Sequence, residues 1–198
     1  MTTMAEPSYA GVEPGGLTTT MEIEVLICYM LKSVGQPIDR DDLSILLVGG
    51  GMANYFDTQT ALEELIRRGH ITETVNAVCI APTGEQIAEE LSRRIPYTLR
   101  DRSVKAALQT LKRREIEHDN PVAIRPLEDG AYAVDCTIRD GERDLLTVSL
   151  RVTDMAQAEA VRENFLKDPA VMYRSVMAVL SGDSRVRQAG AQIIIDLL

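Results

Sequence analysis

The chain has 198 residues, enough for one ordinary domain or two small ones. Its 21 Lys and Arg against 30 Asp and Glu give a formal net charge of -9, which excludes a generally basic protein that coats DNA. Aromatic residues make up only 4%, with no Trp, and this argues against a base-stacking surface for single-stranded nucleic acid. A nucleic-acid role would therefore need a local basic patch.

Residues 1–18 contain Pro, Gly, Ser and Thr with little apolar content, so a disordered leader is predicted there. This segment lacks the basic start and apolar centre of a secretory signal. The longest apolar run, Val25–Leu31, has seven residues, whereas a membrane-spanning helix needs about 20. We expect a cytoplasmic protein that has no membrane partner.

Two helices are predicted after the leader. The first begins with Thr19 and Glu22 as a capping box and continues with apolar residues at helical spacing. The second is capped by Asp39 or Asp41 and ends at the three glycines 49–51. A phosphate-binding loop would need a strand before such glycines and a helix straight after them, so we interpret them as a helix-ending turn.

A third helix is predicted with Asp57 as its cap and Gly69 as its end. Its inward stripe consists of Thr58, Ala61, Leu62, Leu65 and Ile66. Residues 70–75 and 77–81 then form two short β-rich runs around Asn76, which is typical of a hairpin.

A fourth helix is predicted from Thr83, where Gln86 completes a second capping box, to a stop at Pro96. Three helices, a hairpin and a closing helix form the element order of a winged helix-turn-helix domain, here over residues 19–98. In such domains the third helix reads DNA and the hairpin is the wing.

The rest of the chain predicts a basic connecting helix over residues 99–120, with an apolar stripe of Val104, Leu108 and Leu111. A three-stranded antiparallel meander follows, with strands at 121–127, 131–138 and 145–152 and Asp-Gly turns between them.

Two further helices pack on the meander in this prediction. The first is capped by Thr153 or Asp154 and carries Ala156, Ala160, Val161 and Phe165, and the second opens at Asp168-Pro169. The apolar face of residues 188–198 is interpreted as core or as a dimer contact. The expected fold class is α+β, with residues 121–198 as a dimerisation or sensing domain.

A set of residues in the first domain resembles a known bacterial family: Asn54-Tyr55-Phe56, Gln59, Leu62, Leu65-Ile66, Gly69, Thr83-Gly84 and Ile95-Pro96. The chain is similar from about Met21 to its C-terminal helices to an uncharacterised winged-helix family, a domain of unknown function found mainly in Gram-positive anaerobes. The resemblance implies a winged-helix fold and, by analogy, transcription regulation. It implies no substrate, cofactor or catalytic residue.

Charge is distributed unevenly along the chain. Residues 21–98 have six basic and twelve acidic side chains, whereas residues 93–114 have eight basic side chains and one acidic one, Asp101. This basic cluster is either a phosphate-binding surface or a solvated helix face that pairs with the acidic residues of the same protein. Both interpretations stay open.

The leading hypothesis is a dimeric, DNA-binding transcription regulator. The candidate base-reading residues lie on or just before the third helix: Asn54, Gln59, Thr60 and Arg67. The candidate phosphate-binding residues are Arg68, Arg93, Arg94, Arg100, Arg102 and Lys105. Two observations argue against DNA binding. Glu63 and Glu64 carry a negative charge, which DNA phosphates repel, and residues 72–77 of the hairpin contain no Lys or Arg that could anchor a wing in the minor groove. The alternative is a winged-helix protein-interaction module without DNA binding.

An enzyme is not expected. His70 and His118 are the two histidines, and neither has a Cys or Ser partner, or a second metal ligand, at an interpretable spacing. Cys28, Cys79 and Cys136 lie in apolar segments and are interpreted as small buried side chains. The expected partners are double-stranded DNA, a second copy of the chain, and an unidentified small-molecule or protein effector, with no metal and no cofactor.

Overall fold

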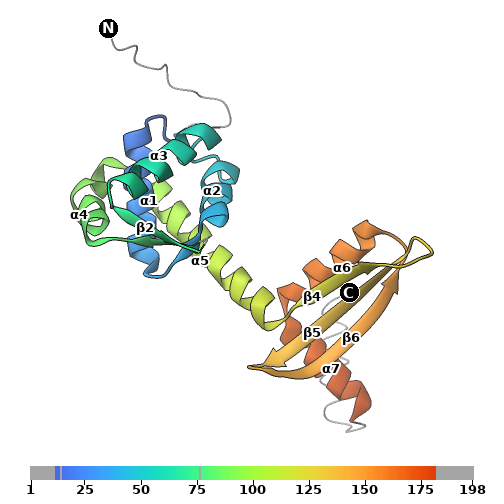
Figure 1. The fold of residues 1–198 in the computed structure, drawn as a ribbon. Coiled ribbons are helices and arrows are strands. Elements are labelled where there is room, and N and C mark those ends of the chain that lie inside the picture. The colour runs from blue at the N-terminus through green and yellow to red at the C-terminus, as the bar shows by residue number, and fades with distance from the viewer. Residues whose placement is uncertain (1–11, 14, 76, 182–198) are drawn as a thin grey trace. The chain divides into compact units, whose positions relative to one another are not determined.

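The computed structural model describes residues 12–13, 15–75 and 77–181 (Figure 1). These residues form an α+β protein with seven α-helices, one short 3-10 helix and two three-stranded antiparallel sheets. The chain divides into two compact units, residues 1–111 (unit 1) and 112–198 (unit 2). Within the described residues, no helix is both long enough and apolar enough to cross a membrane.

Helix α1 (Thr20–Val34) forms the centre of unit 1. Its predicted start is confirmed, because the Thr19 hydroxyl oxygen accepts a hydrogen bond from the Glu22 backbone N–H at 3.3 Å. The Glu22 carboxylate accepts a bond from the Thr19 hydroxyl at 2.8 Å instead of completing a capping box with the Thr19 N–H. Gly35 ends the helix with φ +71, and its N–H donates to the Leu31 carbonyl.

Helix α2 (Arg40–Gly49) is capped by Asp39, whose carboxylate accepts from the N–H groups of Asp41 and Asp42 at 2.9 and 3.4 Å. The glycines end this helix, as predicted. Gly51 has φ +61 and its N–H donates to the Val48 carbonyl at 2.9 Å.

Helix α3 (Tyr55–Arg67) begins three residues earlier than predicted. Asn54, not Asp57, is its cap: the Asn54 side-chain oxygen accepts from the Asp57 N–H at 2.9 Å. Asp57 lies in the first turn, where a carboxylate is favoured by the helix dipole. The predicted cap is therefore wrong, although the predicted inward stripe is confirmed for Thr58, Ala61, Leu62 and Leu65, which are buried.

The sheet of unit 1 contains β1 (Ile38–Asp39), β2 (Ile71–Thr74) and β3 (Ala77–Ile80) in the order β1-β3-β2. The hairpin β2–β3 is confirmed, with Ile71 opposite Ile80 and Thr74 opposite Ala77. Strand β1 was not predicted, because two residues are too few to show a periodic pattern.

Helix α4 (Pro82–Leu91) follows the hairpin and continues into the 3-10 turn η1 (Ser92–Arg94). The capping box predicted at Thr83 is wrong, because the helix starts with Pro at its first position and Ala81 caps it without a side-chain bond. The Thr83 hydroxyl donates instead to the Gly69 carbonyl at 3.0 Å, which ties the start of α4 to the end of α3.

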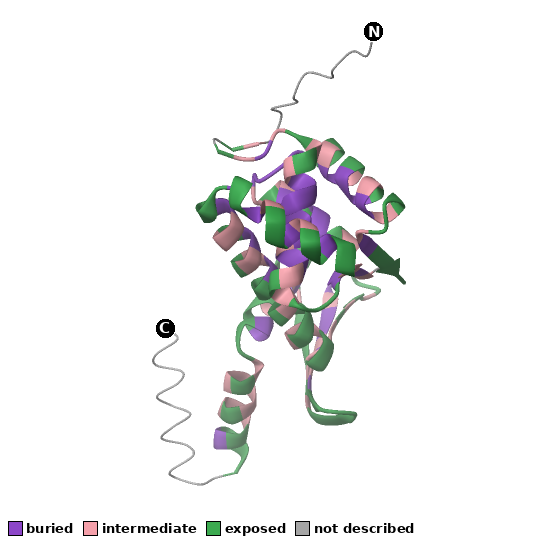
Figure 2. Ribbon diagram, turned by 90° about the vertical axis from the view of Figure 1, so that its left-hand side faces the viewer, coloured by how far each residue is buried: buried purple, intermediate pink, exposed green. Residues whose placement is uncertain are grey.

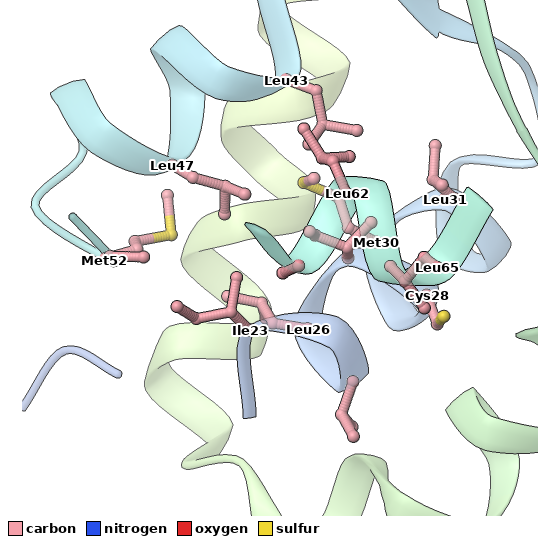
Figure 3. Close-up of a cluster of buried hydrophobic side chains, with 14 of the residues drawn as sticks. Ile23, Leu26, Cys28, Met30, Leu31, Leu43, Leu47, Met52, Leu62 and Leu65 are labelled. Carbon is pink, nitrogen blue, oxygen red and sulfur yellow. The ribbon is translucent and has the colours of Figure 1, made fainter. Parts of the chain in front are cut away.

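Apolar side chains of the first three helices meet in one core, as the close-up shows (Figure 3). Ile23, Leu26 and Met30 of α1 lie against Leu43 and Leu47 of α2 and Leu62 and Leu65 of α3. Cys28 belongs to this core, and its burial raises the pKa of the thiol to about 12. The interpretation of the cysteines as small buried side chains is confirmed for Cys28 and Cys136.

Helix α5 (Tyr97–Asp119) contains the boundary between the units. Its predicted apolar stripe is wrong at Leu108, which is 47% exposed, whereas Leu111 is half-buried against the core of unit 1. The fully buried residues of the helix are Leu99, Ser103 and Ala107. The buried positions also follow helical spacing, and two of them have small side chains that let a neighbouring backbone approach closely.

Unit 2 contains the predicted meander: β4 (Val122–Pro126), β5 (Tyr132–Asp140) and β6 (Arg143–Val152), in the order β4-β5-β6. All neighbouring pairs are antiparallel, and the register shifts between Ile138 and Arg139. Gly130 and Gly141 adopt φ +84 and +60 in the two turns, a conformation that favours glycine.

Helices α6 (Met155–Lys167) and α7 (Pro169–Leu180) complete unit 2, with Asp154 and Asp168 as caps. The inward residues of α6 are Ala158, Phe165 and Leu166; Ala156 and Ala160, predicted on that face, are exposed. The buried cluster consists of Val134, Cys136, Ile138, Ala158, Phe165 and Leu166. Figure 2 shows buried residues at the centre of unit 1 and exposed residues on the outer sides of its helices.

Part of the predicted leader packs against unit 1. Leu17 is buried, its N–H donates to the Met52 carbonyl at 2.8 Å, and the Glu13 N–H donates to the Gly51 carbonyl at 3.0 Å. The packed chain therefore begins before Thr19. The apolar face predicted over residues 188–198 lies outside the described residues.

Candidate functional site

The start of α3 is built around Asn54, which was predicted to read bases. Asn54 is buried, its side-chain oxygen caps the helix, and its amide group donates to the Asp57 carboxylate. Its backbone carbonyl accepts from the Thr58 hydroxyl at 2.7 Å. The structure thus places Asn54 where it fixes the direction of α3.

Gln59 also makes contacts inside unit 1. Its Nε2 donates to Ser44 Oγ of α2 at 2.9 Å, and its Oε1 accepts from Arg40 Nη2 at 3.4 Å. The Arg40 guanidinium in turn pairs with Glu73 of β2 at 3.2 Å. Gln59 therefore connects α3 with α2, and Arg40 extends the connection to the hairpin.

The exposed side of α3 carries Thr60, Glu63 and Arg67. The Thr60 hydroxyl donates to the Phe56 carbonyl at 2.9 Å, a bond that stays within the helix. Of the residues predicted to read bases, Thr60 and Arg67 are the two with exposed side chains.

Arg67 and Arg68 share an acidic partner. Both guanidinium groups pair with the Glu64 carboxylate, Arg68 at 3.0 Å, and Arg68 also pairs with Glu24 of α1 at 3.4 Å. The hydrogen bond from Arg67 holds the pKa of Glu64 below its usual value. At neutral pH the two arginines at the end of α3 are therefore largely neutralised by two carboxylates.

Glu24 is a buried carboxylate on α1. Burial raises its pKa above the usual value, and the Coulomb attraction of Arg68 opposes that effect only in part. A raised pKa in the folded state means that the native protein binds a proton more tightly than the unfolded chain does. The charge of Glu24 therefore costs stability at neutral pH, and this cost disappears as the pH falls to the usual pKa of 4.5.

We expect Glu24→Gln to have a higher free energy of unfolding than the wild type at pH 7 to 8, with a difference that shrinks as the pH falls toward 4.5. Urea unfolding followed by circular dichroism across this pH range measures the difference. Glu63→Gln, which removes an exposed carboxylate, is the control and should show no such trend. A difference for Glu24→Gln that does not change with pH would contradict the assignment.

The basic cluster of residues 93–114 is not one uniform surface. In unit 1, Arg102 donates to the Gly50 carbonyl at 2.9 Å and pairs with Glu13 at 3.1 Å, and Lys105 pairs with Asp101 at 2.8 Å. The Arg100 guanidinium lies 5.3 Å from the centre of the Tyr29 ring and 5.9 Å from that of Tyr97.

Arg93 and Arg94 differ from these cations. Both are exposed on η1, and neither makes an ion pair in the part of the chain that the structure describes. The remaining cations of the cluster, Lys112, Arg113 and Arg114, belong to unit 2, where Arg113 pairs with Glu117 and Glu163. Most cations of the cluster are thus engaged within the protein, as the second interpretation holds. Among the described residues, Arg93, Arg94 and Lys112 make no ion pair, and phosphate binding by the cluster stays a prediction.

Two aromatic side chains at the start of α3 were not proposed as functional. Tyr55 and Phe56 are 55% and 78% exposed, and their rings contact edge to face with centroids 5.7 Å apart. Ile45 of α2 is a further exposed apolar residue, 67% accessible. The sequence holds the signal for Phe56, which falls outside the 3-4 spacing of the buried stripe, whereas Tyr55 lies three residues before the buried Thr58 and follows that spacing.

Unit 2 has a cavity of about 540 Å³, within the size range of small-molecule sites. Its lining is mainly apolar, with Ile116, Ile138 and Tyr173, and it includes two cations, Lys112 and Lys167, and one carboxylate, Asp168. Among the described residues, no group of three His, Cys, Asp or Glu side chains is placed to hold a metal ion.

Comparison with known proteins gives a family and no individual relative. No curated protein and no solved structure matches the chain. A family model, described as "Domain of unknown function (DUF4364)", matches residues 23–180, which include most of both units. The chain therefore belongs to this family of unknown function.

Proposed function

We propose that unit 1 is a winged helix-turn-helix domain and that the protein is a DNA-binding transcription regulator. The observation that carries the proposal is the element order α1-β1-α2-α3-β2-β3-α4 together with the sheet order β1-β3-β2. In helix-turn-helix proteins the second helix of the motif enters the major groove, and here that helix is α3. The β2–β3 hairpin that follows α3 takes the place of the wing.

We assign the DNA contacts to side chains that are exposed. Phe56, Thr60 and Glu63 of α3 face the base edges; Phe can contact a thymine methyl group, and Glu can accept from a cytosine amino group. Asn54 and Gln59 hold α3 in place and do not read bases. Arg93 and Arg94 bind phosphates, because their charges are not used within unit 1.

Fluorescence anisotropy with a labelled mixed-sequence duplex tests the proposal. We expect binding at low salt with an affinity that falls as salt rises, by a slope of about -0.9 in log K against log salt for each phosphate contact. Selection from a random duplex pool should then enrich one sequence. No binding at low salt, or binding that does not respond to salt, would overturn DNA binding as the function.

A second candidate is a protein-interaction module that has the same fold. It is favoured by the exposed Tyr55, Phe56 and Ile45 and by the pairing of Arg67 and Arg68 with carboxylates. In this case a cellular partner is captured equally well with and without nuclease, and Phe56→Ala abolishes capture whereas Glu63→Ala, at a nearby exposed position of α3, does not.

The effector remains part of the proposal. The pocket of unit 2 combines apolar walls with two cations, Lys112 and Lys167, and one carboxylate, Asp168, so its net positive lining suits an apolar molecule that carries a negative charge. The proposed regulator needs no catalytic residue, metal or cofactor, and it acts in the cytoplasm, where its DNA lies.

A further inference from the structure

The strands at the sheet edges differ in how they are protected against pairing. Strand β6 has ten residues and bonds to β5 on one side; on its other side it has no strand partner within the described residues. An unpaired strand presents a row of N–H and C=O groups that can bond to another strand.

The other edges are short or blocked. β4 has five residues and includes Arg125 and Pro126, and proline removes the N–H group that a further strand would need. In unit 1, β1 has two residues and β2 has four. The centre of β6, residues 146–150, contains neither proline nor charge.

The apolar face of the unit 2 sheet is incompletely covered near β6. Val134, Cys136 and Ile138 of β5 are buried on this face, and they lie opposite Leu150, Val148 and Leu146 of β6. These three β6 residues are only partly buried, and Leu150 is 39% exposed. A strand added at β6 would bury apolar surface as well as satisfy backbone groups.

We propose that β6 pairs with β6 of a second copy of the chain to form a continuous six-stranded sheet. A two-fold axis through Val148 places Leu146 opposite the partner's Leu150 and Thr147 opposite the partner's Ser149. A two-fold axis through Ser149 instead places Val148 opposite the partner's Leu150. In either register apolar residues meet apolar residues on one face and the opposite face is polar. A second copy of β6 thus offers the edge a strand whose apolar and polar faces match its own, and we take it as the occupant.

A matched pair of lysine substitutions tests this interface. Thr147 on β6 and Thr137 on β5 lie opposite each other, and their hydroxyl groups are 3.2 Å apart, so each variant loses the same hydrogen bond. Thr147→Lys alone introduces its charge at the edge. With the axis through Val148, the new charges of the two copies lie diagonally across the axis; with the axis through Ser149, each lies opposite the partner's Arg151. Thr137→Lys introduces the same charge one strand further in.

Light scattering during size-exclusion chromatography gives the result. We expect a mass of twice 21.8 kDa for the wild type and Thr137→Lys at micromolar concentration, and 21.8 kDa for Thr147→Lys. Circular dichroism confirms that each variant is folded, and hydrogen exchange of β6 amides should be slower in the wild type than in Thr147→Lys. A single-chain mass for the wild type, or equal masses for the two folded variants, would overturn the proposal. The inference does not depend on DNA binding.

Discussion

Replacing Gly84 by alanine is expected to destabilise unit 1 by about 3 kcal/mol, at the upper end of the usual cost of overpacking. Gly84 lies in the first turn of α4, and a Cβ atom there would be 2.2 Å from the His70 carbonyl oxygen and 3.1 Å from Ile80 Cγ1. The obstacle is backbone, which cannot turn away as a flexible side chain can. Helix α4 would have to move away from the hairpin, and urea unfolding should show a lower midpoint.

Gly49→Ala is the matched control for this prediction. Gly49 is also helical, but a Cβ atom there meets nothing within 4 Å, so alanine should be neutral or stabilise by about 0.5–1 kcal/mol through its helix propensity. Similar unfolding midpoints for Gly84→Ala and the wild type would show that α4 and the hairpin are not held in this close contact.

Removing both Arg93 and Arg94 is expected to weaken duplex binding about 100-fold at 50 mM salt, if the proposed function holds. Each phosphate contact contributes about 0.9 to the salt slope, which corresponds to roughly tenfold in affinity at this salt concentration relative to 1 M. The double variant Arg93→Ala/Arg94→Ala should therefore also have a slope smaller by about 1.8. Anisotropy titrations over a range of salt concentrations measure both quantities.

Arg102→Ala separates this effect from a general loss of positive charge. Arg102 is engaged with the Gly50 carbonyl and Glu13, so its removal should lower stability and leave the salt slope nearly unchanged. An equal loss of slope for Arg102→Ala and for a single Arg93→Ala variant would mean that net charge, and not two particular phosphate contacts, controls binding.

Apart from the short elements β1 and η1, the element order of both units could be predicted from the sequence because local chemistry marks most boundaries. Thr19 and Gly35 begin and end α1, Asp39 begins α2, and Asp168-Pro169 begins α7. Caps were assigned wrongly where two candidates lay close together. Asn54, and not Asp57, caps α3, and the Thr83 hydroxyl bonds to the Gly69 carbonyl, 14 residues earlier, so Thr83 does not cap α4.

The candidate site was less predictable, since its character depends on contacts between distant parts of the chain. The pairing of Arg68 with Glu24 spans 44 residues, and the bond between Gln59 and Ser44 spans 15. The sequence shows that such charged and polar residues exist, but spacing along one helix does not show that a buried carboxylate on α1 lies beside Arg68. The exposure of Phe56, by contrast, could be predicted from the helical periodicity of α3, whereas Tyr55 follows the spacing of the buried residues and is exposed all the same.

If two copies pair through β6 as proposed, Pro126 limits how the assembly can grow. The unit 2 sheet has two edge strands in the described part of the chain, β4 and β6. Because β4 is short and ends in proline, pairing through β6 leaves no second edge of this sheet open. A chain with two open edges could add copies at both ends and polymerise into a fibre, whereas a chain with one open edge stops at two copies. Pro126, on the edge strand opposite β6, would thus limit the assembly to two copies and prevent the growth of a fibril.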